Sequence, residues 1–455
     1  MQALNGLKTC IARFGICLLW ASTLAGGSAL AETPVSADQM RNLHVAVVYN
    51  DDAIQIRYRY PIDEPSWYHQ VWRYTDGDWV RHGSGSPDAD PAGLYEDRIS
   101  MMLADDSVPE FMRLGGFMTA HEGMRSLDSA VDAEDVRSHP LLGEAMGRSD
   151  VRKYIPRSRN NESEAAWDDI RAQEELEAMR KRGEFLDLWQ WRAHRSNPVG
   201  KADNGYVLHY RMSSDGLGSF TTNWDDESGQ PAWMFDPEVT GFHALSWDRL
   251  LERGYGQDDY YFLSEDHAIA FNPDHEWQEG DVIPQRFLRE PSGSRGAILA
   301  EGRHDDGAWH VVLTRSLKAP DPTDSLALEP GGEYTVAFAV HEGQGARWHH
   351  VSMPIALRLD DDSEPAAATS MPRIMAQRVD GDLSEAVVEY TRVELISPGQ
   401  ITRQWLHGAG HPGQTLVRDT EIGFHDVAPL HPLEQLVEWI SHHERTGDLP
   451  EDAPR

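Results

Sequence analysis

Histidine and methionine side chains form groups along the chain whose spacing suits metal ligation. The chain has 21 histidines and 14 methionines. The groups are Met118/His121/Met124, Trp189/Trp191/His194, His349/His350/Met353 and His407/His411/His425. Neutral imidazole and thioether groups ligate both ferric and ferrous iron, so they serve as axial ligands of electron-transfer haems. The supply of these residues therefore makes a haem-iron site one interpretation of the chain.

The stretch GGFMTAHEGM, residues 115–124, holds the most concentrated of these groups. Packing explains Phe117 and Met118, because a methionine beside an aromatic ring usually fills a core. It does not readily explain the whole run. We expect His121 to be one axial ligand, with Met118 as its alternate. The alternative is a histidine that merely follows a Gly-Gly bend.

The opposite ligand is expected in HHVSMPIALRL, residues 349–359. We favour His350 there, with Met353 as its alternate. Neighbouring residues of a strand point to opposite faces, so His349 and His350 cannot share one. If Val351 and Met353 face the core, His349 faces it with them and is the substitute ligand.

The stretch LDLWQWRAHRSNPVG, residues 186–200, supplies possible walls and anion partners for a haem. Trp189 and Trp191 share one face of a strand, where they line the haem slot or pack in the core. Arg192 or Arg195 would pair with a haem propionate, since guanidinium groups bind carboxylates in a fixed geometry.

The N-terminal segment predicts a secretory signal peptide over residues 1–31. Lys8 and Arg13 make a positive region, an apolar run spans 14–24, and a small-residue cleavage site ends at Ala31. The run is short for a bilayer-spanning helix. We therefore expect cleavage after about Ala31, export to the periplasm, and no integral membrane segment in the mature chain.

Cysteine content and charge exclude several classes of protein. The two cysteines, Cys10 and Cys17, lie inside the predicted signal peptide. A mature chain without cysteine has no disulfides, no iron–sulfur clusters and no covalently attached haem. The formal charge of −34 argues against a nucleic-acid partner. No phosphate-binding loop, GxSxG or HExxH motif is present, which favours electron transfer over bond chemistry.

Alternating hydrophobic residues predict a mainly β protein. Residues 53–61 alternate apolar and polar side chains, and a turn at Asn50-Asp51-Asp52 joins them to a preceding strand. Further strands are expected at 205–212, 308–317, 334–343 and 349–359. Many short strands with turn signals between them predict an antiparallel β-sandwich over residues 38–360.

Three segments depart from this pattern. A helical insertion is expected at about 115–185, where residues 161–182 carry acidic side chains early and basic ones late, as a helix dipole favours. A linker rich in Asp, Ala, Ser and Pro is expected at 361–375. A C-terminal extension at 376–455 would include an amphipathic helix at 431–448.

Several longer stretches resemble one family. EDRISMMLADDSVPEFMRLGGFMTAH, LDLWQWRAHRSNPVGKADNGYVLHYR, GAWHVVLTRSL and EYTVAFAVHEGQGARWHHVSMPIAL are similar to the haem-binding domain of ethylbenzene dehydrogenase gamma subunits and cytochrome c-552-like proteins. The resemblance covers roughly residues 40–360. It implies a β-sandwich that binds one haem b and carries electrons from a periplasmic molybdenum subunit. In the best-known gamma subunits the axial pair is Met and Lys.

Some longer relatives, by the same resemblance, carry cysteines at the positions of Gly116 and Ala120. Those cysteines are absent here, so the haem would be held non-covalently. The first hypothesis is thus a periplasmic haem b electron-transfer protein whose partner is an oxidoreductase or a cytochrome c. The second is a haem-free β-sandwich that binds a carbohydrate or a protein, with the Trp residues as a platform.

Overall fold

The computed structural model describes residues 40–86, 89–119, 121, 123–124, 130–162, 165–345, 349–359 and 371–396. Backbone contacts divide the chain into Met1–Asp38 and Gln39–Arg455, and every described residue belongs to the second unit. The predicted signal peptide and the predicted helix at 431–448 lie outside the described residues. Within the described ranges, no helix is both long enough and apolar enough to cross a membrane.

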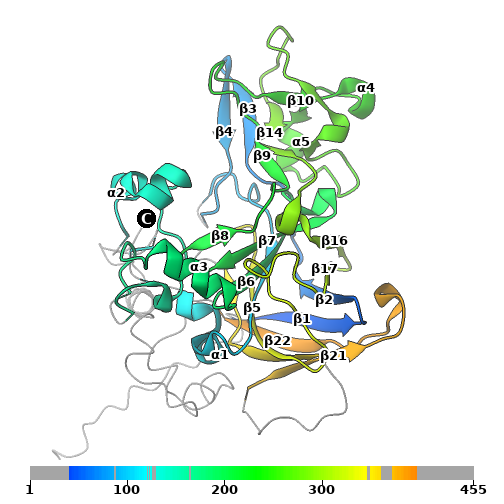
Figure 1. The fold of residues 1–455 in the computed structure, drawn as a ribbon. Coiled ribbons are helices and arrows are strands. Elements are labelled where there is room, and N and C mark those ends of the chain that lie inside the picture. The colour runs from blue at the N-terminus through cyan, green and yellow to red at the C-terminus, as the bar shows by residue number, and fades with distance from the viewer. Residues whose placement is uncertain are drawn as a thin grey trace, which may run out of the picture. The chain divides into compact units, whose positions relative to one another are not determined.

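Ten strands of the described chain close into a barrel. In order around it they are β1 (Met40–Tyr49), β2 (Ala53–Pro61), β17 (Ala308–Ser316), β16 (Ile298–Asp305), β7 (Lys201–Val207), β6 (Leu186–Arg192), β5 (Arg98–Ala104), β18 (Glu333–His341), β20 (Ile355–Leu359) and β21 (Arg373–Arg378). The ring closes at β1, which pairs with β2 on one side and with β21 on the other. Figure 1 shows the blue early strands beside the orange late ones. The same sheet also includes β8 (Arg211–Ser213), β19 (His350–Val351) and β22 (Thr391–Ile396).

This closure corrects the predicted sandwich, although the mainly β class is confirmed. Most strand pairs are antiparallel, but β21 is parallel to both β1 and β20. The closing strand β21 spans residues that the sequence assigned to the linker (361–375) and to the C-terminal extension (376–455). An open sandwich keeps unpaired sheet edges, and pairing β1 with β21 removes them. The sequence does not show this, because the paired strands lie at opposite ends of the described chain.

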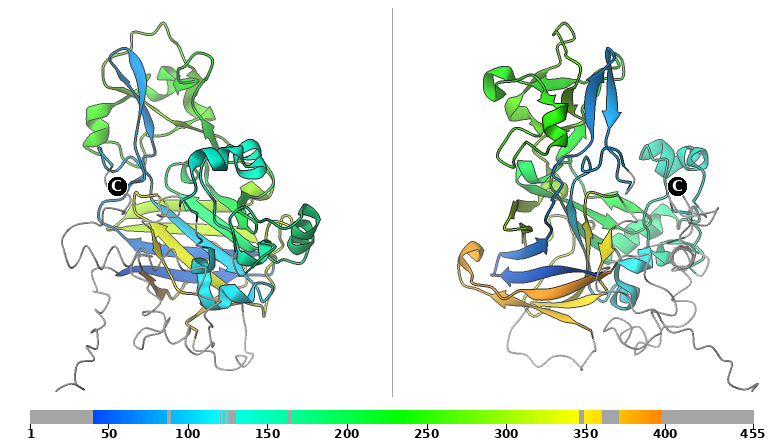
Figure 2. Two further views of the ribbon diagram at one scale, coloured as in Figure 1. Left: turned by 90° about the vertical axis from the view of Figure 1, so that its left-hand side faces the viewer. Right: turned by 180° about the vertical axis from the view of Figure 1, so that it is seen from behind.

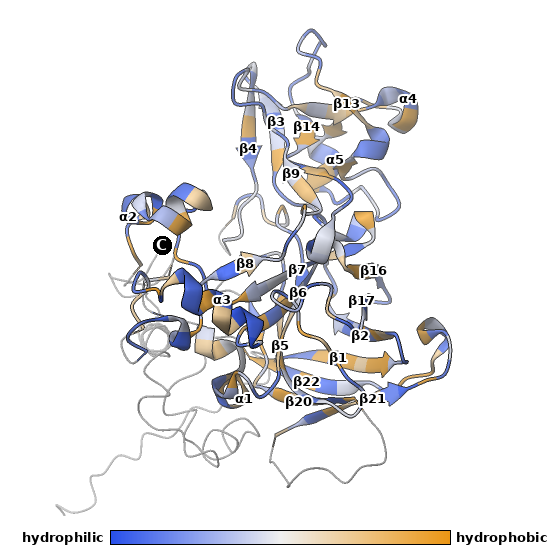
Figure 3. Cartoon of the chain, in the orientation of Figure 1, coloured by the Kyte–Doolittle hydropathy of each residue, from blue (hydrophilic) through white to orange (hydrophobic). Residues whose placement is uncertain are grey.

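The hairpin of β1 and β2 follows the predicted pattern. Tyr49 pairs with Ile54 across the Asn50–Asp52 turn. The alternate residues of β2 from Ile54 to Tyr60 are buried in the barrel core, where Trp189 and Trp309 also lie. Figure 3 shows that β1, which pairs with β2, is largely hydrophobic.

The strands β5, β6 and β18 are buried on both faces. One set of side chains packs inside the barrel, and the other joins a second apolar cluster with the helical segments. All seven residues of β6 are buried, so no polar alternation marks this strand. Short helices lie between β5 and β6: α1 (Pro109–Leu114), η2 (Gly115–Thr119), α2 (Ala133–Ser138), η3 (Pro140–Ala145), η4 (Pro156–Ser158) and α3 (Gln173–Lys181). Of the helix-prone residues 161–182, α3 is the part that forms an α-helix.

A second group of short elements has its own aromatic core, which the sequence did not predict. One small sheet contains β3 (Val71–Thr75), β4 (Asp78–His82), β11 (Leu245–Ser246) and β14 (Asp281–Pro284), and another contains β9 (Phe220–Thr222), β12 (Leu263–Ser264) and β15 (Arg286–Leu288). The group also contains β10 (Trp233–Phe235), β13 (Ala268–Ala270), α4 (Pro237–Thr240), α5 (Trp247–Leu251) and η6 (Glu265–His267). Outside the group, the other short helices of the described chain are η5 (Asn197–Val199), η7 (Gly293–Gly296) and η8 (Leu383–Glu385). Figure 2 shows the blue β3–β4 hairpin beside the green segments that contribute β14.

Candidate functional site: a cavity on the outer face of the barrel

A cavity of about 540 Å³ lies against the outer face of the barrel. Its floor is formed by outward side chains of β5, β6, β7 and β18. Its cover comes from the segments between β5 and β6, and β8 and the second aromatic group close one side. The volume lies in the range of about 300–1,000 Å³ that is usual for ligand and cofactor sites.

The strand register sorts the floor side chains into three rows, because directly paired residues point to the same face. The first row contains two cations, Arg192 and Arg98, and His341, whose pKa burial lowers well below its ordinary value. The second row is mostly polar and contains Asp203, Gln190, Ser100 and Ala339. The third row is apolar and contains Gly205, Leu188, Met102 and Ala337. The floor therefore changes from cationic to apolar along the strands.

Positive charge is concentrated in this cavity, in contrast to the whole chain. Nine lining residues are cationic and two, Asp150 and Asp203, are acidic. The chain as a whole carries a formal charge of −34. Such a concentration favours an anionic ligand, since a charged cleft attracts the opposite charge.

Asp203 is the acidic residue that holds part of the cationic end in place. It accepts from Arg192 at 2.8 Å and from Arg295 at 2.7 Å. Burial alone would raise the pKa of this carboxyl group, but the two guanidinium groups lower it to about 2. Asp203 is therefore ionised across the neutral pH range and neutralises one of its two arginine partners.

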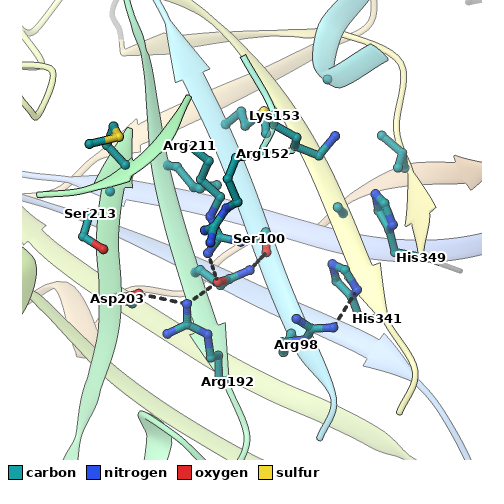
Figure 4. Close-up of a pocket in the computed structure, with 18 of the residues that line it drawn as sticks. Arg98, Ser100, Arg152, Lys153, Arg192, Asp203, Arg211, Ser213, His341 and His349 are labelled. Atoms are coloured by element: carbon teal, nitrogen blue, oxygen red, sulfur yellow. Dashed lines mark hydrogen bonds and ion pairs between the residues drawn. The ribbon is translucent and has the colours of Figure 1, made fainter. Parts of the chain in front are cut away.

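Several lining residues are potential iron ligands. Those with nitrogen donors are Lys153, His341 and His349, and those with thioether donors are Met102, Met124 and Met212. The rings of His341 and His349 lie 4.6 Å apart with planes 13° apart. Figure 4 shows the amine of Lys153 on the side of the cavity where His349 lies.

Lys153 stands out among these donors. Its Nζ donates to the Thr119 hydroxyl at 2.9 Å. Burial, with a smaller contribution from Arg211, lowers its pKa to about 8. A neutral amine has a lone pair for a metal, so this environment makes ligation easier than at an exposed lysine.

The predicted ligands His121 and Met118 lie near the cavity but do not line it. His121 is buried and stacks on Tyr154, with ring centroids 3.8 Å apart and planes 9° apart. Its Nε2 lies 2.7 Å from the Tyr154 carbonyl oxygen. Met118 packs in the apolar cluster that includes Phe117. Their ligand roles stay predictions.

The other predicted residues are placed differently. His350 lies on β19, pairs with Val340 of β18 and does not line the cavity. His349, the predicted substitute ligand, does line it. Met353 is buried in the apolar cluster outside the barrel. Trp191 is fully buried inside the barrel, with its ring centroid 5.0 Å from that of Trp309.

Arg195, like the other predicted propionate partner Arg192, lines the cavity. Its Nε donates to Glu96, and its backbone N–H donates to Glu96 Oε2 at 2.7 Å. Glu96 is fully buried, and although burial alone would raise its pKa, Arg195 lowers it. Arg195 therefore already has a carboxylate partner within the chain.

The sequence missed most of the cavity. Arg98, Arg211 and Arg286, which all line the cavity, were not predicted. Lys153 could have been found from the rarity of lysine, because few candidates for a lysine ligand exist. The chain has five lysines, Lys8, Lys153, Lys181, Lys201 and Lys318. Within the described ranges, no group of three or more His, Cys, Asp or Glu residues is placed to hold a metal ion. A porphyrin-bound iron needs axial ligands rather than such a group.

The family model described as "Ethylbenzene dehydrogenase" matches residues 23–352. The chain belongs to the ethylbenzene dehydrogenase family. The family match includes every residue that lines the cavity, from Tyr95 to Val351. Strands β20, β21 and β22 follow the matched region. No curated protein matches the chain.

Proposed function

We propose that this chain is an exported haem b-binding protein that transfers electrons as a subunit or partner of a molybdoenzyme-type oxidoreductase. The observation that carries the proposal is the cavity floor, which is apolar at one end and cationic at the other. A haem has the matching polarity, with an apolar ring and two propionates on one edge. Membership of the ethylbenzene dehydrogenase family supports the link to an oxidoreductase complex.

The chain offers complementary groups for each part of a haem. The ring would lie over Leu188, Met102 and Ala337, where no charge has to be buried. The propionates would lie toward Arg195 and Arg286, which both line the cavity beside Phe220, because arginine binds carboxylates through two parallel hydrogen bonds. When bound, haem supplies one-electron chemistry, and the protein fixes the ligands and excludes water.

We assign the axial ligands to residues on opposite walls of the cavity. Lys153 belongs to the cover and Met102 to the floor, so this pair agrees with the Met–Lys ligation that the family resemblance implies. His349 and Met124 also line the cavity and are the alternates to Lys153. The ligand roles of His121 and His350 stay predictions, so both are tested in the same experiment as Lys153 and Met102.

The test is a visible spectrum of the purified protein with and without dithionite. We expect a Soret band and sharp reduced α and β bands typical of six-coordinate haem. Lys153→Leu and Met102→Leu should each shift the spectrum toward the high-spin form, whereas His121→Phe and His350→Phe should not. A colourless protein that takes up no added haemin would end the haem proposal.

Export and partner choice rest on the sequence. The signal-like N-terminus favours a periplasmic location, where an oxidoreductase or a cytochrome c would be the electron partner. The alternative of a haem-free module with a Trp platform has less support. Trp189 and Trp191 are fully buried inside the barrel, so they form no exposed platform.

A further inference from the structure

Two arginines at the floor of the cavity share one neutral acceptor. Gln190 Oε1 accepts from Arg211 Nη2 at 2.7 Å and also from Arg192 Nη2. The amide nitrogen of Gln190 donates to Ser100 Oγ at 3.0 Å. Figure 4 shows Arg211 reaching toward Arg192 and Ser100 over this part of the floor. A neutral amide brings these two cations together without neutralising either.

The guanidinium groups here retain donors with no described acceptor. Arg192 is 4% exposed, and its Nε and Nη1 have no hydrogen-bond partner among the described residues. Arg98 is 7% exposed, and its Nε likewise has none. An unpaired donor on a buried charge is costly, so an acceptor from outside the chain is expected at this place.

Counting charges shows that two propionates do not balance the cavity. Nine cations line it, and its neutralising carboxylates are Asp150, Asp203 and Glu96, the last through Arg195. Lys153 is neutral as an iron ligand and Arg152 has a contact of its own, so four arginines remain without a carboxylate among the described residues, and two propionates would neutralise two of them. Arg98, Arg211 and Arg286 form no ion pair within the described part of the chain.

The pKa values agree with this excess of positive charge. Burial lowers the pKa of Arg98 to about 10. Burial, together with the nearby Arg152 and Arg192, lowers the pKa of Arg211 well below its ordinary value. Both shifts mean that the cations repel one another in a weakly solvated place and are relieved by an anion.

We propose that the cationic end of the cavity, formed by Arg98, Arg192, Arg211, Gln190 and Ser100, binds a small oxyanion or carboxylate separate from the haem propionates. The guanidinium forks suit a tetrahedral oxyanion or a planar carboxylate, which both accept paired hydrogen bonds. The Ser100 hydroxyl adds a neutral donor. That this anion is additional to the propionates rests on the proposed haem site. That the arginines bind an anion does not rest on it.

The test is isothermal titration of inorganic phosphate into the protein at constant ionic strength, in its haem-free and haem-loaded forms. We expect phosphate to bind both forms. Arg211→Gln and Arg98→Gln should weaken binding at least tenfold, whereas Arg303→Gln, at an exposed pair with Asp258, should not. Arg211→Lys keeps the charge and should retain part of the affinity, which separates loss of the site from loss of folding.

The remaining outcomes decide between the two proposals. If phosphate binds only the haem-free form, the haem propionates occupy the arginine donors in the loaded protein. The proposal of a separate anion is then rejected. Equal binding by wild type and both glutamine variants places phosphate elsewhere on the surface and also rejects it. If the protein takes up no haem but binds phosphate through these arginines, the anion site stands and the haem proposal fails.

Discussion

Asp187 and Arg315 form an ion pair inside the barrel, with 2.8 Å between Asp187 Oδ2 and Arg315 Nη1. Their side chains are 0% and 1% exposed. Asp187 Oδ2 also accepts from the Leu326 backbone N–H at 2.9 Å, and the Arg315 guanidinium lies 4.4 Å from the centre of the Trp189 ring. The pair therefore joins β6, β17 and the segment that follows β17.

Removing one partner of this pair should be strongly destabilising. We expect Asp187→Ala to lower the free energy of unfolding by about 3–5 kcal/mol, because it leaves a buried guanidinium without its counter-charge. Urea denaturation followed by fluorescence measures the loss. Asp258→Ala at the exposed Arg303–Asp258 pair is the control and should leave stability almost unchanged. An equally stable Asp187→Ala protein would show that water or another group reaches Arg315.

Gly302 should tolerate no side chain, because Trp191 occupies the space beside it. A Cβ at this position of β16 would lie 2.5 Å from Trp191 Cζ2 inside the closed barrel. We expect Gly302→Ala to cost about 1–3 kcal/mol of unfolding free energy through forced repacking. Gly256→Ala is a matched control, since its Cβ would meet its nearest atom at 3.7 Å. Equal denaturation midpoints for the two variants would contradict this packing.

The stability of the protein should fall on mild acidification, in part through His209. Burial, with contributions from Arg159 and Arg180, lowers the pKa of His209 from 6.5 to about 4. Between these values the unfolded chain binds the proton and the folded chain does not, so the unfolding free energy decreases as pH falls. The loss from this one residue is up to about 1.4 kcal/mol per pH unit.

His209→Phe provides the comparison for this pH dependence. Above pH 6.5 both proteins should show the same slope of unfolding free energy with pH, because neither state of His209 carries a charge there. Between about pH 4.5 and 6 the variant should show a shallower slope, measured by urea denaturation at each pH. Parallel curves over that range would mean that His209 is protonated in the folded protein.

The sequence predicted the positions of several strands, β18 among them, but missed the site, which lies on strands that are buried on both faces. Alternation identified β2, and the turn at Asn50–Asp52 identified its hairpin. In β6 the inner residues pack in the barrel and the outer ones face the cavity, so LDLWQWR has no clear period. Closure of the barrel through β21 depends on pairing between distant segments, for which local sequence carries no signal.

Spacing along the chain missed most of the cavity lining for a related reason. Spacing along the chain grouped His121 with Met118 and Met124, but of the three only Met124 lines the cavity. His349 and Val351 both line the cavity, and residues two apart share a face wherever the chain is extended. Lys153 and the arginines come from separate elements, so their convergence follows from the tertiary fold alone.

His121 should prove to be a structural residue whose ring is replaceable. His121→Phe keeps a ring for the stack on Tyr154 but loses the contact of Nε2 with the Tyr154 carbonyl oxygen at 2.7 Å. We expect a cost of about 0.5–1.5 kcal/mol in unfolding free energy, the usual contribution of one hydrogen bond. His121→Ala should cost more, because it also removes the buried ring and leaves a cavity. The haem spectrum of His121→Phe should match that of the wild type, and conversion to a high-spin form would instead establish His121 as an iron ligand.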